Sequence, residues 1–197
     1  VGEAGDEPRL IARRCPGVTV FINADRVAAA RAAVAQGFNF LLLDDGFQHR
    51  RLARDLDLLL EVGVGNDLLL PAGPFREPAS HARRATHVWR RDVDYRSELA
   101  PLTGRYVLLL GVARPDLVTQ SVERAGGEVV AVHAYADHHV FTPDELARAQ
   151  RDARALDATL ATTEKDAERL PPGSAVAFAL TLKAPPLSSL LPASAKR

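Results

Sequence analysis

A short apolar run that ends in two adjacent carboxylates limits the possible folds of this chain more than any other stretch. Phe40 to Leu43 are apolar without alternation, and Asp44, Asp45 and Gly46 follow directly. An unbroken apolar run predicts a strand buried on both faces, as in a parallel sheet covered by helices. Carboxylates at the C-terminal end of such a strand lie where open α/β sheets bind ligands, and nucleotide-hydrolysing enzymes place a Mg²⁺-organising aspartate there. The alternative is an ordinary Asp-Asp-Gly surface turn.

The composition describes a neutral chain with enough apolar residues for a real core. Its 197 residues carry 25 Lys and Arg against 25 Asp and Glu, and 47% are hydrophobic. A neutral chain lacks the basic face that non-specific nucleic-acid binding needs, so we expect no nucleic-acid partner. The single cysteine, Cys15, excludes an internal disulfide and fits a reducing compartment. No apolar run approaches the roughly 20 residues of a membrane-spanning helix.

Apolar runs alternate with helical segments along most of the chain. Strands are predicted at residues 18–23, 40–44, 56–62, 87–90, 106–112, 129–133, 159–162 and 175–180. Helices are predicted at residues 26–36, 78–84, 115–125, 142–155 and 164–170. Alternation at this spacing predicts βαβ units, and therefore an α/β protein with a mainly parallel sheet. The polar, aperiodic residues 92–104 predict a boundary between two domains, residues 1–103 and 104–197.

Two further acidic or charged groups could carry chemistry. Gly5-Asp6-Glu7-Pro8 places two carboxylates between turn residues, a pattern that is typical of a simple turn. In residues 71–78, PAGPFREP, prolines and a glycine stiffen the approach to Arg76 and Glu77. A rigidly presented guanidinium matches phosphate oxygens. A structural loop with a surface ion pair explains the same pattern.

A histidine pair forms the last strong candidate. Asp137, His138 and His139 follow a predicted strand and precede a capped helix. An aspartate beside a histidine can orient the ring for general-base work near neutral pH, and all three residues are also possible metal ligands. A polar loop at a helix entry is the alternative. Residues 162–166, TTEKD, end a strand in charged residues, which indicates capping more than chemistry.

Taken in order, these segments resemble the tetraacyldisaccharide 4'-kinase family, the lipid A 4'-kinases. The motifs that carry the resemblance are GDEP (5–8), DDGFQHRRLARD (44–55), LLPAGPFREP (69–78), GVARP (111–115), DHHVFT (137–142) and TTEKDAERL (162–170). DDGFQH followed by PAGPxREP is the specific part, and the other segments agree in order and spacing. The resemblance covers nearly the whole chain, from about residue 2 to residue 182.

The resemblance implies a P-loop NTPase-like fold, a mainly parallel sheet flanked by helices, with a smaller C-terminal α/β domain. Residues 1–103 would then be a truncated nucleotide- and metal-binding core. The implied reaction transfers the ATP γ-phosphate to the 4'-hydroxyl of tetraacyldisaccharide 1-phosphate, giving lipid IVA in lipid A biosynthesis. ATP and Mg²⁺ are the implied cofactors, and the lipid A disaccharide precursor is the implied partner. The full-length protein would be peripheral on the cytoplasmic face of the bacterial inner membrane and would contact the membrane surface.

The family pattern also implies which side chains handle the nucleotide and the metal. Asp44 and Asp45 would organise Mg²⁺. Gln48 and His49 would lie beside them at the nucleotide. This arrangement fits phosphoryl transfer, which needs positioning and charge neutralisation more than covalent chemistry.

The remaining implied roles concern the acceptor and the transferring phosphate. Asp6 would be the carboxylate that activates the acceptor, acting with His138 or His139, of which we favour His138. A sugar hydroxyl is a weak nucleophile, so a carboxylate or an Asp–His pair that accepts its proton is useful. Arg76 and Glu77 would line the phosphate and metal site.

The sequence departs from the family pattern at its start. Neither Gly-Lys-Ser nor Gly-Lys-Thr occurs, so the glycine-rich GxxxxGK[ST] loop that holds the β- and γ-phosphates is not in these residues. The chain begins at Val1 and contains no methionine. We therefore expect a fragment of a longer protein, without the family's P-loop and N-terminal membrane-anchoring segment.

Two other functions compete with the kinase. A metal-dependent phosphohydrolase is one, because Asp-His-His also marks phosphoesterases with parallel α/β domains, although it does not explain PAGPFREP. A non-catalytic remnant of the kinase fold is the other, because the phosphate loop is not in the chain. A glycine-rich GKS or GKT segment upstream would favour the kinase over both.

We predict that residues 1–197 alone have no meaningful kinase activity. Loss of one preorganised donor typically costs about 100- to 1,000-fold in rate, and loss of a whole phosphate loop costs more. A radiolabelled ATP assay on the isolated chain tests this. Near-normal turnover would contradict the prediction.

Overall fold

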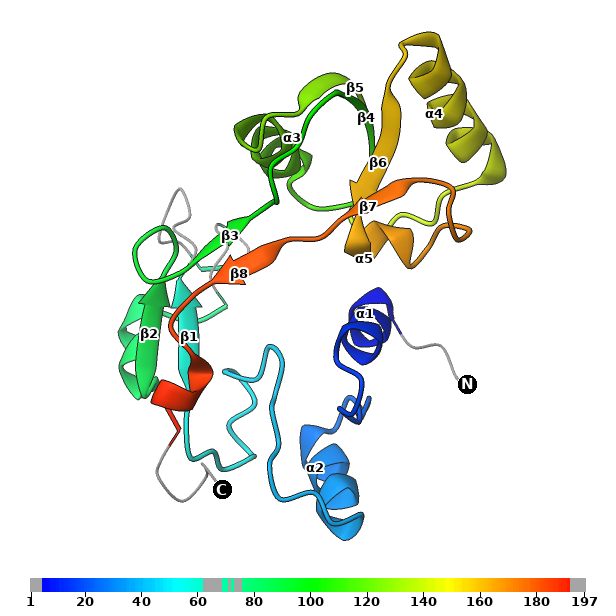
Figure 1. Cartoon of the computed structure of the whole chain (residues 1–197). Coiled ribbons are helices and arrows are strands. Elements are labelled where there is room, and N and C mark those ends of the chain that lie inside the picture. Colours follow the sequence, from blue (N-terminus) through cyan, green and yellow to red (C-terminus); the bar gives the residue numbers. More distant parts are fainter. Residues whose placement is uncertain (1–4, 62–68, 71, 73–75, 192–197) are drawn as a thin grey trace. The chain divides into compact units, whose positions relative to one another are not determined.

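The computed structural model of the 197-residue chain describes residues 5–61, 69, 70, 72 and 76–191. It divides into two compact units (Figure 1). Unit 1 comprises Val1–Val20 and Ser97–Thr181, and unit 2 comprises Phe21–Arg96 and Leu182–Arg197. The proposed domains, 1–103 and 104–197, stay a prediction, whereas in the structure residues 5–20 belong to the same compact unit as residues 97–181.

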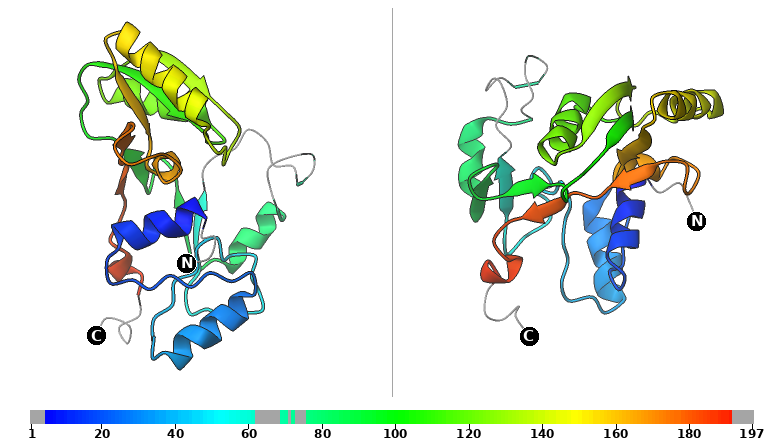
Figure 2. Two further views of the ribbon diagram at one scale, coloured as in Figure 1. Left: turned by 90° about the vertical axis from the view of Figure 1, so that its right-hand side faces the viewer. Right: turned by 45° about the horizontal axis from the view of Figure 1, so that its top comes forward.

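A parallel four-stranded sheet is the centre of unit 1, and its strand order is β5-β4-β6-β7. The strands are β4 (Arg105–Leu110), β5 (Glu128–Ala134), β6 (Thr159–Thr163) and β7 (Val176–Phe178). The helices of this unit are α1 (Asp6–Arg14), α3 (Pro115–Arg124), α4 (Pro143–Ala155) and α5 (Glu164–Ala167). Helices α3 and α4 connect successive strands, as Figures 1 and 2 show, which makes the unit a set of βαβ crossovers.

The central strand β4 explains why this sheet is covered on both faces. Residues 107–110 are completely buried. Val107 and Leu109 pack in one cluster with Ala149 of α4, whereas Leu108 and Leu110 pack in another with Val122 of α3. Because successive side chains of a strand point to opposite faces, an unbroken apolar run needs a helix on each side.

Local sequence signals set the ends of the unit 1 helices. The Thr142 side chain accepts from the backbone N–H of Glu145, and the Glu145 side chain accepts from the backbone N–H of Thr142, a complete capping box for α4. Helix α1 has Asp6 and Glu7 in its first turn and Arg13 and Arg14 in its last, as the helix dipole favours. Helix α1 was not predicted, because Gly5-Asp6-Glu7-Pro8 is a pattern typical of a turn.

Unit 2 contains less regular structure among its described residues. Helix α2 (Arg26–Ala35) begins after Asp25, whose side chain accepts from the backbone N–H groups of Val27 and Ala28. Strands β1 (Leu58–Glu61) and β2 (His87–Arg90) pair in parallel, and a 3₁₀ helix, η1 (Ala79–Arg84), precedes β2.

Two short strands lie where the chain passes between the units. β3 (Arg96–Glu98) and β8 (Thr181–Lys183) pair as a separate two-stranded sheet. A second 3₁₀ helix, η2 (Leu187–Ser189), follows β8. Among the described residues, none of the helices has the length and apolar character that crossing a membrane requires.

Most of the predicted elements are confirmed, but two predicted strands are wrong. Residues 18–23 and 40–44 contain no strand, and the side chains of Phe40 and Leu42 are exposed, Leu42 by 81%. The sheets of the described residues hold no hydrogen-bonded neighbour for either run. An apolar run shows that a segment can be buried on both faces, but a strand forms only where neighbouring strands pair with it.

We predict that the two faces of β4 contribute separately to stability. Leu108→Ala and Leu109→Ala should each lower the free energy of unfolding by about 2–5 kcal/mol, because each leaves a cavity against a different helix. Val132→Ala, at an exposed β5 position, should change it by less than about 0.5 kcal/mol. Urea unfolding followed by circular dichroism measures all three, and equal values for Leu109→Ala and Val132→Ala would contradict the two-faced core.

Candidate active site

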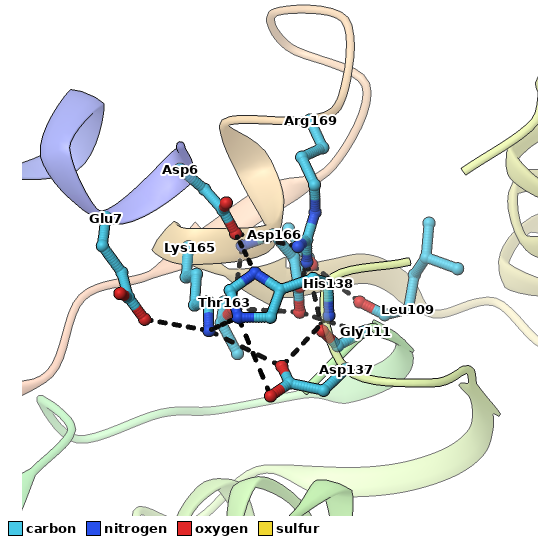
Figure 3. A network of polar contacts seen from close by, with 11 residues as sticks. Asp6, Glu7, Leu109, Gly111, Asp137, His138, Thr163, Lys165, Asp166 and Arg169 are labelled. Atoms are coloured by element: carbon cyan, nitrogen blue, oxygen red, sulfur yellow. Dashed lines mark hydrogen bonds and ion pairs between the residues drawn. The ribbon is translucent and has the colours of Figure 1, made fainter. Parts of the chain in front are cut away.

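The polar side chains of unit 1 gather at the carboxyl ends of its parallel strands. Gly111 follows β4, Asp137 and His138 lie beyond β5, and Lys165 and Asp166 follow β6 in α5. The carboxyl ends of parallel strands lie at one edge of a sheet, where α/β folds bind their ligands. Figure 3 shows these residues together with Asp6 and Glu7 from the first turn of α1.

The centre of the cluster is a contact between Asp6 and His138. Asp6 Oδ2 lies 3.2 Å from His138 Nδ1, although 132 positions separate the residues in the sequence. The Asp6 side chain is only 11% exposed, whereas the His138 side chain is 53% exposed. The buried carboxylate therefore supports an imidazole that solvent or a substrate can reach.

The His138 backbone is held in a conformation that few histidines adopt. Its φ is 60°, in the left-handed region, and its N–H donates to the carbonyl of Gly111 at 3.0 Å. The Asp137 carboxylate lies 3.1 Å from the same N–H. Such a backbone conformation persists only where the surrounding contacts hold it, and residues of this kind cluster at functional sites.

Arg169 contacts Asp6 from the other side. Its Nη1 donates to Asp6 Oδ2 at 2.8 Å, and its Nη2 donates to the Gly111 carbonyl at 3.1 Å and to Asp166 Oδ1. Asp166 is fully buried and accepts from the Gly111 N–H at 3.1 Å and from Thr163 Oγ1 at 3.0 Å. Every charge in this group therefore has a partner of opposite charge and hydrogen bonds, as buried charges require.

Lys165 approaches the exposed side of His138. Its Nζ lies 3.2 Å from His138 Nε2, 3.0 Å from Glu7 Oε1 and 3.5 Å from Asp137 Oδ1. Burial lowers the pKa of Lys165, but the carboxylates of Glu7, Asp137 and Asp6 outweigh this effect, so its pKa is raised. Lys165 is therefore a cation here.

Asp6 and Lys165 determine which ring nitrogen carries the proton when His138 is neutral. An ammonium group has only donors, so His138 Nε2 must accept from Lys165. The ring proton then sits on Nδ1 and is donated to Asp6 Oδ2. This is the tautomer in which a carboxylate orients the imidazole and leaves Nε2 as the basic nitrogen.

Asp6 stays ionised despite its burial. Burial raises its pKa, but the backbone N–H of Asp6 and the charges of Arg169, His138 and Lys165 lower it further, and the net pKa is below the usual value. The carboxylate thus carries its negative charge next to the imidazole at neutral pH. Such a charge stabilises an imidazolium when the ring takes up a proton.

The second histidine of the motif faces away from this cluster. His139 Nε2 lies 2.9 Å from Glu145 Oε2 in the α4 capping box, and its ring stacks on Tyr135 with centroids 4.6 Å apart. His138 therefore lies at Asp6, and His139 lies at the start of α4.

In unit 2, the predicted metal carboxylates lie at the surface. Asp44 and Asp45 form an exposed turn, and Asp45 has a φ of 50°. Arg76 Nη1 donates to Asp45 Oδ2 at 2.8 Å, so the structure brings together two residues predicted for the phosphate and metal site. The expected position of the carboxylates at the end of a buried strand is wrong, because residues 40–43 form no strand.

In the structure, Glu77 pairs with Arg84 and His81, and its predicted place at the phosphate and metal site stays a prediction. Arg84 donates to both of its carboxylate oxygens at 2.9 and 3.0 Å, and His81 Nδ1 lies 2.7 Å from Oε2. The hydrogen bonds from Arg84 and His81 lower the pKa of Glu77 to about 2. The Arg84 guanidinium also lies 4.6 Å from the centre of the Phe47 ring. Glu77 therefore holds Arg84, the last residue of η1, against Phe47 of the DDGFQH motif.

Gln48 and His49 line a cavity of about 350 Å³ in unit 2. The other lining residues come from the start of α2 and from an arginine-rich loop: Ala24, Asp25, Arg26, Val27, Arg50, Arg51 and Leu52. The cationic lining suits an anionic ligand. Pro71 and residues 73–75 of the PAGPFREP motif lie outside the described residues.

The donor set of unit 2 fits Mg²⁺ bound with a nucleotide. Mg²⁺ is usually held by one or two carboxylates together with substrate phosphates and waters, and the adjacent Asp44 and Asp45 can supply this number. Within the described residues, no group of three or more His, Cys, Asp or Glu side chains could hold a metal on its own. The site would therefore need phosphate oxygens to complete the coordination.

Sequence reasoning missed the basic half of the unit 1 cluster. Lys165 and Arg169 belong to TTEKDAERL, which we interpreted mainly as capping, and Thr163 does cap α5 by accepting from the backbone N–H of Asp166. The family resemblance could have indicated their role, because TTEKDAERL and GVARP are both among the motifs that carry it. Thr163 and Asp166 therefore both take part in the cap of α5 and belong to the polar cluster.

Comparison with known proteins agrees with these motifs. The family model described as tetraacyldisaccharide-1-P 4'-kinase matches residues 1–102 and 90–191. A curated tetraacyldisaccharide 4'-kinase from Anaeromyxobacter sp. strain Fw109-5 is 42% identical over 217 aligned positions, which cover 88% of this chain and 58% of that protein. Another, from Rhodospirillum centenum, is 40% identical and is matched over 86% of this chain and 57% of its own length. This chain thus spans less than two thirds of these relatives.

A solved structure shows the same fold. LpxK from Aquifex aeolicus, crystallised in complex with ATP, matches with a TM-score of 0.73 and 26% identity over 95% of this chain and 67% of that one. The predicted α/β class, a P-loop NTPase-like fold with a mainly parallel sheet, is confirmed. With the family model matching nearly every residue, the chain belongs to the tetraacyldisaccharide-1-phosphate 4'-kinase family.

Proposed function

We propose that the protein containing this chain transfers the γ-phosphate of ATP to the 4'-hydroxyl of tetraacyldisaccharide 1-phosphate, forming lipid IVA in lipid A biosynthesis. The observation that carries the proposal is the contact between Asp6 and His138. These residues come from two distant family motifs and form an oriented, partly exposed Asp–His pair at the carboxyl edge of a parallel sheet. The family membership supplies the substrates.

The proposed step needs a proton acceptor beside the sugar hydroxyl. The 4'-oxygen attacks the γ-phosphorus, the bond from that phosphorus to the bridging oxygen breaks, and its electron pair leaves with ADP. The hydroxyl proton passes to the Asp6–His138 pair. General-base assistance of this kind typically contributes about 10²- to 10⁴-fold in rate.

The two members of the pair would share the work. Asp6 is the buried carboxylate that activates the acceptor through His138, by holding the Nδ1–H and stabilising the imidazolium. His138 is the more exposed member, and its Nε2 is the ring nitrogen that does not contact Asp6. Lys165 occupies that nitrogen here, so the acceptor hydroxyl would displace the ammonium when it binds.

Asp44 and Asp45 would hold Mg²⁺, which when bound with ATP neutralises charge on the β- and γ-phosphates. Arg76 reaches Asp45 and presents a guanidinium that suits a phosphate oxygen. Gln48 and His49, in the cationic cavity, are the residues we propose beside the nucleotide. Glu77 would act there through Arg84, which it holds with both oxygens.

The acceptor carries four acyl chains, so the reaction would take place at a membrane surface. We propose that the protein acts peripherally on the cytoplasmic face of the bacterial inner membrane, where ATP and the lipid precursor meet. The family assignment supports this location.

The geometry does not favour the phosphohydrolase alternative. His138 turns to Asp6 and Lys165, and His139 turns to Glu145, so the two rings do not converge on a common point. Asp137 contacts Lys165 at 3.5 Å. An Asp–His base beside a lysine is better suited to accepting a proton than to binding a metal.

We predict that Asp6→Asn and His138→Gln each lower kcat by about 10²- to 10⁴-fold in the longest active form of the protein. Each change removes one member of the pair, so the double variant should be little worse than either single variant. Steady-state transfer of radiolabelled phosphate from ATP to the lipid acceptor measures the effect.

His133→Gln is the matched control, because His133 also pairs with an aspartate, Asp152 at 3.0 Å, outside the cluster. It should keep near-normal kcat. His139→Gln distinguishes the two neighbouring histidines and should cost far less than His138→Gln. A larger loss in His139→Gln would reject the assignment.

We predict that Asp44→Asn and Asp45→Asn raise the Mg²⁺ concentration needed for half-maximal activity, and that chelation by EDTA abolishes activity. Removing one of two carboxylates weakens a site that binds the metal through few protein oxygens. Asp55→Asn, an exposed aspartate of the same loop, is the control. An unchanged Mg²⁺ requirement in both variants would argue against these ligands.

A further inference from the structure

We propose that Arg169 is a positioning residue for the reaction, which fixes the Asp6 carboxylate in the orientation that meets His138. This inference rests on the proposed function only in taking Asp6 and His138 as the reactive pair. Arg169 lies in the last motif of the chain, TTEKDAERL, for which the sequence indicated capping.

The first observation is that one oxygen of Asp6 receives both neighbours. Oδ2 accepts from Arg169 Nη1 at 2.8 Å and lies 3.2 Å from His138 Nδ1. The bond to the guanidinium is the shorter of the two. The position of Arg169 therefore determines where the oxygen that orients the imidazole lies.

The second observation is that the Arg169 guanidinium is itself fixed. Its side chain is only 7% exposed, and three acceptors hold it: Asp6, Asp166 and the Gly111 carbonyl. A planar guanidinium presents its donors in a fixed geometry, so three acceptors leave it one orientation. A lysine at this position would keep the charge but could not hold the same planar set of contacts.

The third observation is that the anchors of Arg169 are joined to the sheet. The Gly111 N–H donates to Asp166 and the Gly111 carbonyl accepts from Arg169, so one peptide segment at the end of β4 holds both members of the ion pair. The Gly111 carbonyl also accepts from the backbone N–H of His138. The same segment therefore sets the positions of Arg169 and His138 relative to each other.

Gly111 is needed for this close approach. A Cβ at this position would lie 3.2 Å from Arg169 Nη2, 3.2 Å from Phe141 Cζ and 3.3 Å from Asp166 Oδ1. Contacts of that length would displace the guanidinium by a few tenths of an ångström. Gly111→Ala is thus a way to move Arg169 without removing any polar group.

The charged groups around Asp6 influence the pKa of its carboxyl. Lys165 in α5, Arg169 in the turn after α5 and His138 in the loop after β5 act on Asp6, and each lowers its pKa. Glu7 on the same helix pairs with Lys165. Loss of Arg169 should therefore move the pKa of Asp6 upward, while the cation at Lys165 remains.

The direct test is NMR titration of the 197-residue chain. We expect Arg169→Gln to raise the pKa of the Asp6 carboxyl and to reduce the signal of the Nδ1–H tautomer at His138. Arg169→Lys should restore part of the first effect, because it keeps the charge, and little of the second. The Asp6→Asn and His138→Gln variants assign the resonances.

Arg14→Gln is the matched control. Arg14 forms an ion pair with Glu164 at 3.2 Å, which also connects α1 to α5, but it does not contact Asp6. If Arg169 only braces α1 against the segment after β6, Arg169→Gln, like Arg14→Gln, should leave the Nδ1–H tautomer signal of His138 unchanged. That result would overturn the proposal.

A kinetic test in the longest active form of the protein measures kcat and the KM for ATP separately. If Arg169 orients Asp6, its loss should slow the chemical step more than it weakens nucleotide binding. We expect Arg169→Gln to lower kcat about 10- to 100-fold with little change in the KM for ATP. An unchanged kcat would overturn the positioning role.

Two outcomes keep this inference separate from the proposed function. If the wild-type protein shows no kinase activity, the proposed function fails, yet the NMR titrations still decide whether Arg169 sets Asp6. If Arg169→Gln does not fold, Gly111→Ala provides the test, because it should change the His138 tautomer signal in the same direction. An unchanged signal in folded Gly111→Ala protein would count against the proposal.

Discussion

The buried carboxylate of Asp6 is the constraint on which the candidate site of unit 1 depends. A charged side chain that is 11% exposed is costly unless cations and hydrogen bonds compensate it, and Asp6 has Arg169 at 2.8 Å and His138 at 3.2 Å. Arg169 in turn needs Asp166, which is completely buried. The first turn of α1 is thereby tied to the carboxyl edge of the sheet by polar contacts. Stability and the orientation of the reactive groups therefore come from the same contacts.

The parallel sheet makes such a cluster possible because it brings the ends of distant segments together. β4 is apolar on both faces and covered by α3 and α4, so its last residues emerge at an edge that no helix needs to cover. Gly111 lies at that edge and contacts Asp166, Arg169 and the His138 backbone. A single glycine at the end of the central strand thus organises residues from two later parts of the chain.

Structural features that neighbouring residues determine could be predicted from the sequence. Features that depend on contacts with distant residues mostly could not. The capping box of α4 and the limits of β2 could be predicted because neighbouring residues determine them. The apolar run at residues 40–43 was misassigned, because pairing with another strand decides its state. The roles of Lys165 and Arg169 were missed for the same reason: their partners lie up to 163 positions away in the sequence. Asp45 and His138 were candidates from local residue patterns, whereas the role of Asp6 came only from the family motif.

The charge balance of the cluster limits how the proposed phosphoryl transfer could take place. Asp6, Glu7, Asp137 and Asp166 face Lys165 and Arg169, so the cluster is formally negative while His138 is neutral. A negative cluster suits acceptance of a proton but repels the phosphates of ATP. In the proposed reaction, phosphate binding would therefore come from other residues, and unit 2 has a guanidinium at Arg76 and a cavity lined by Arg26, Arg50 and Arg51. In the proposed reaction, proton acceptance and part of the phosphate binding would thus fall to separate segments of the chain.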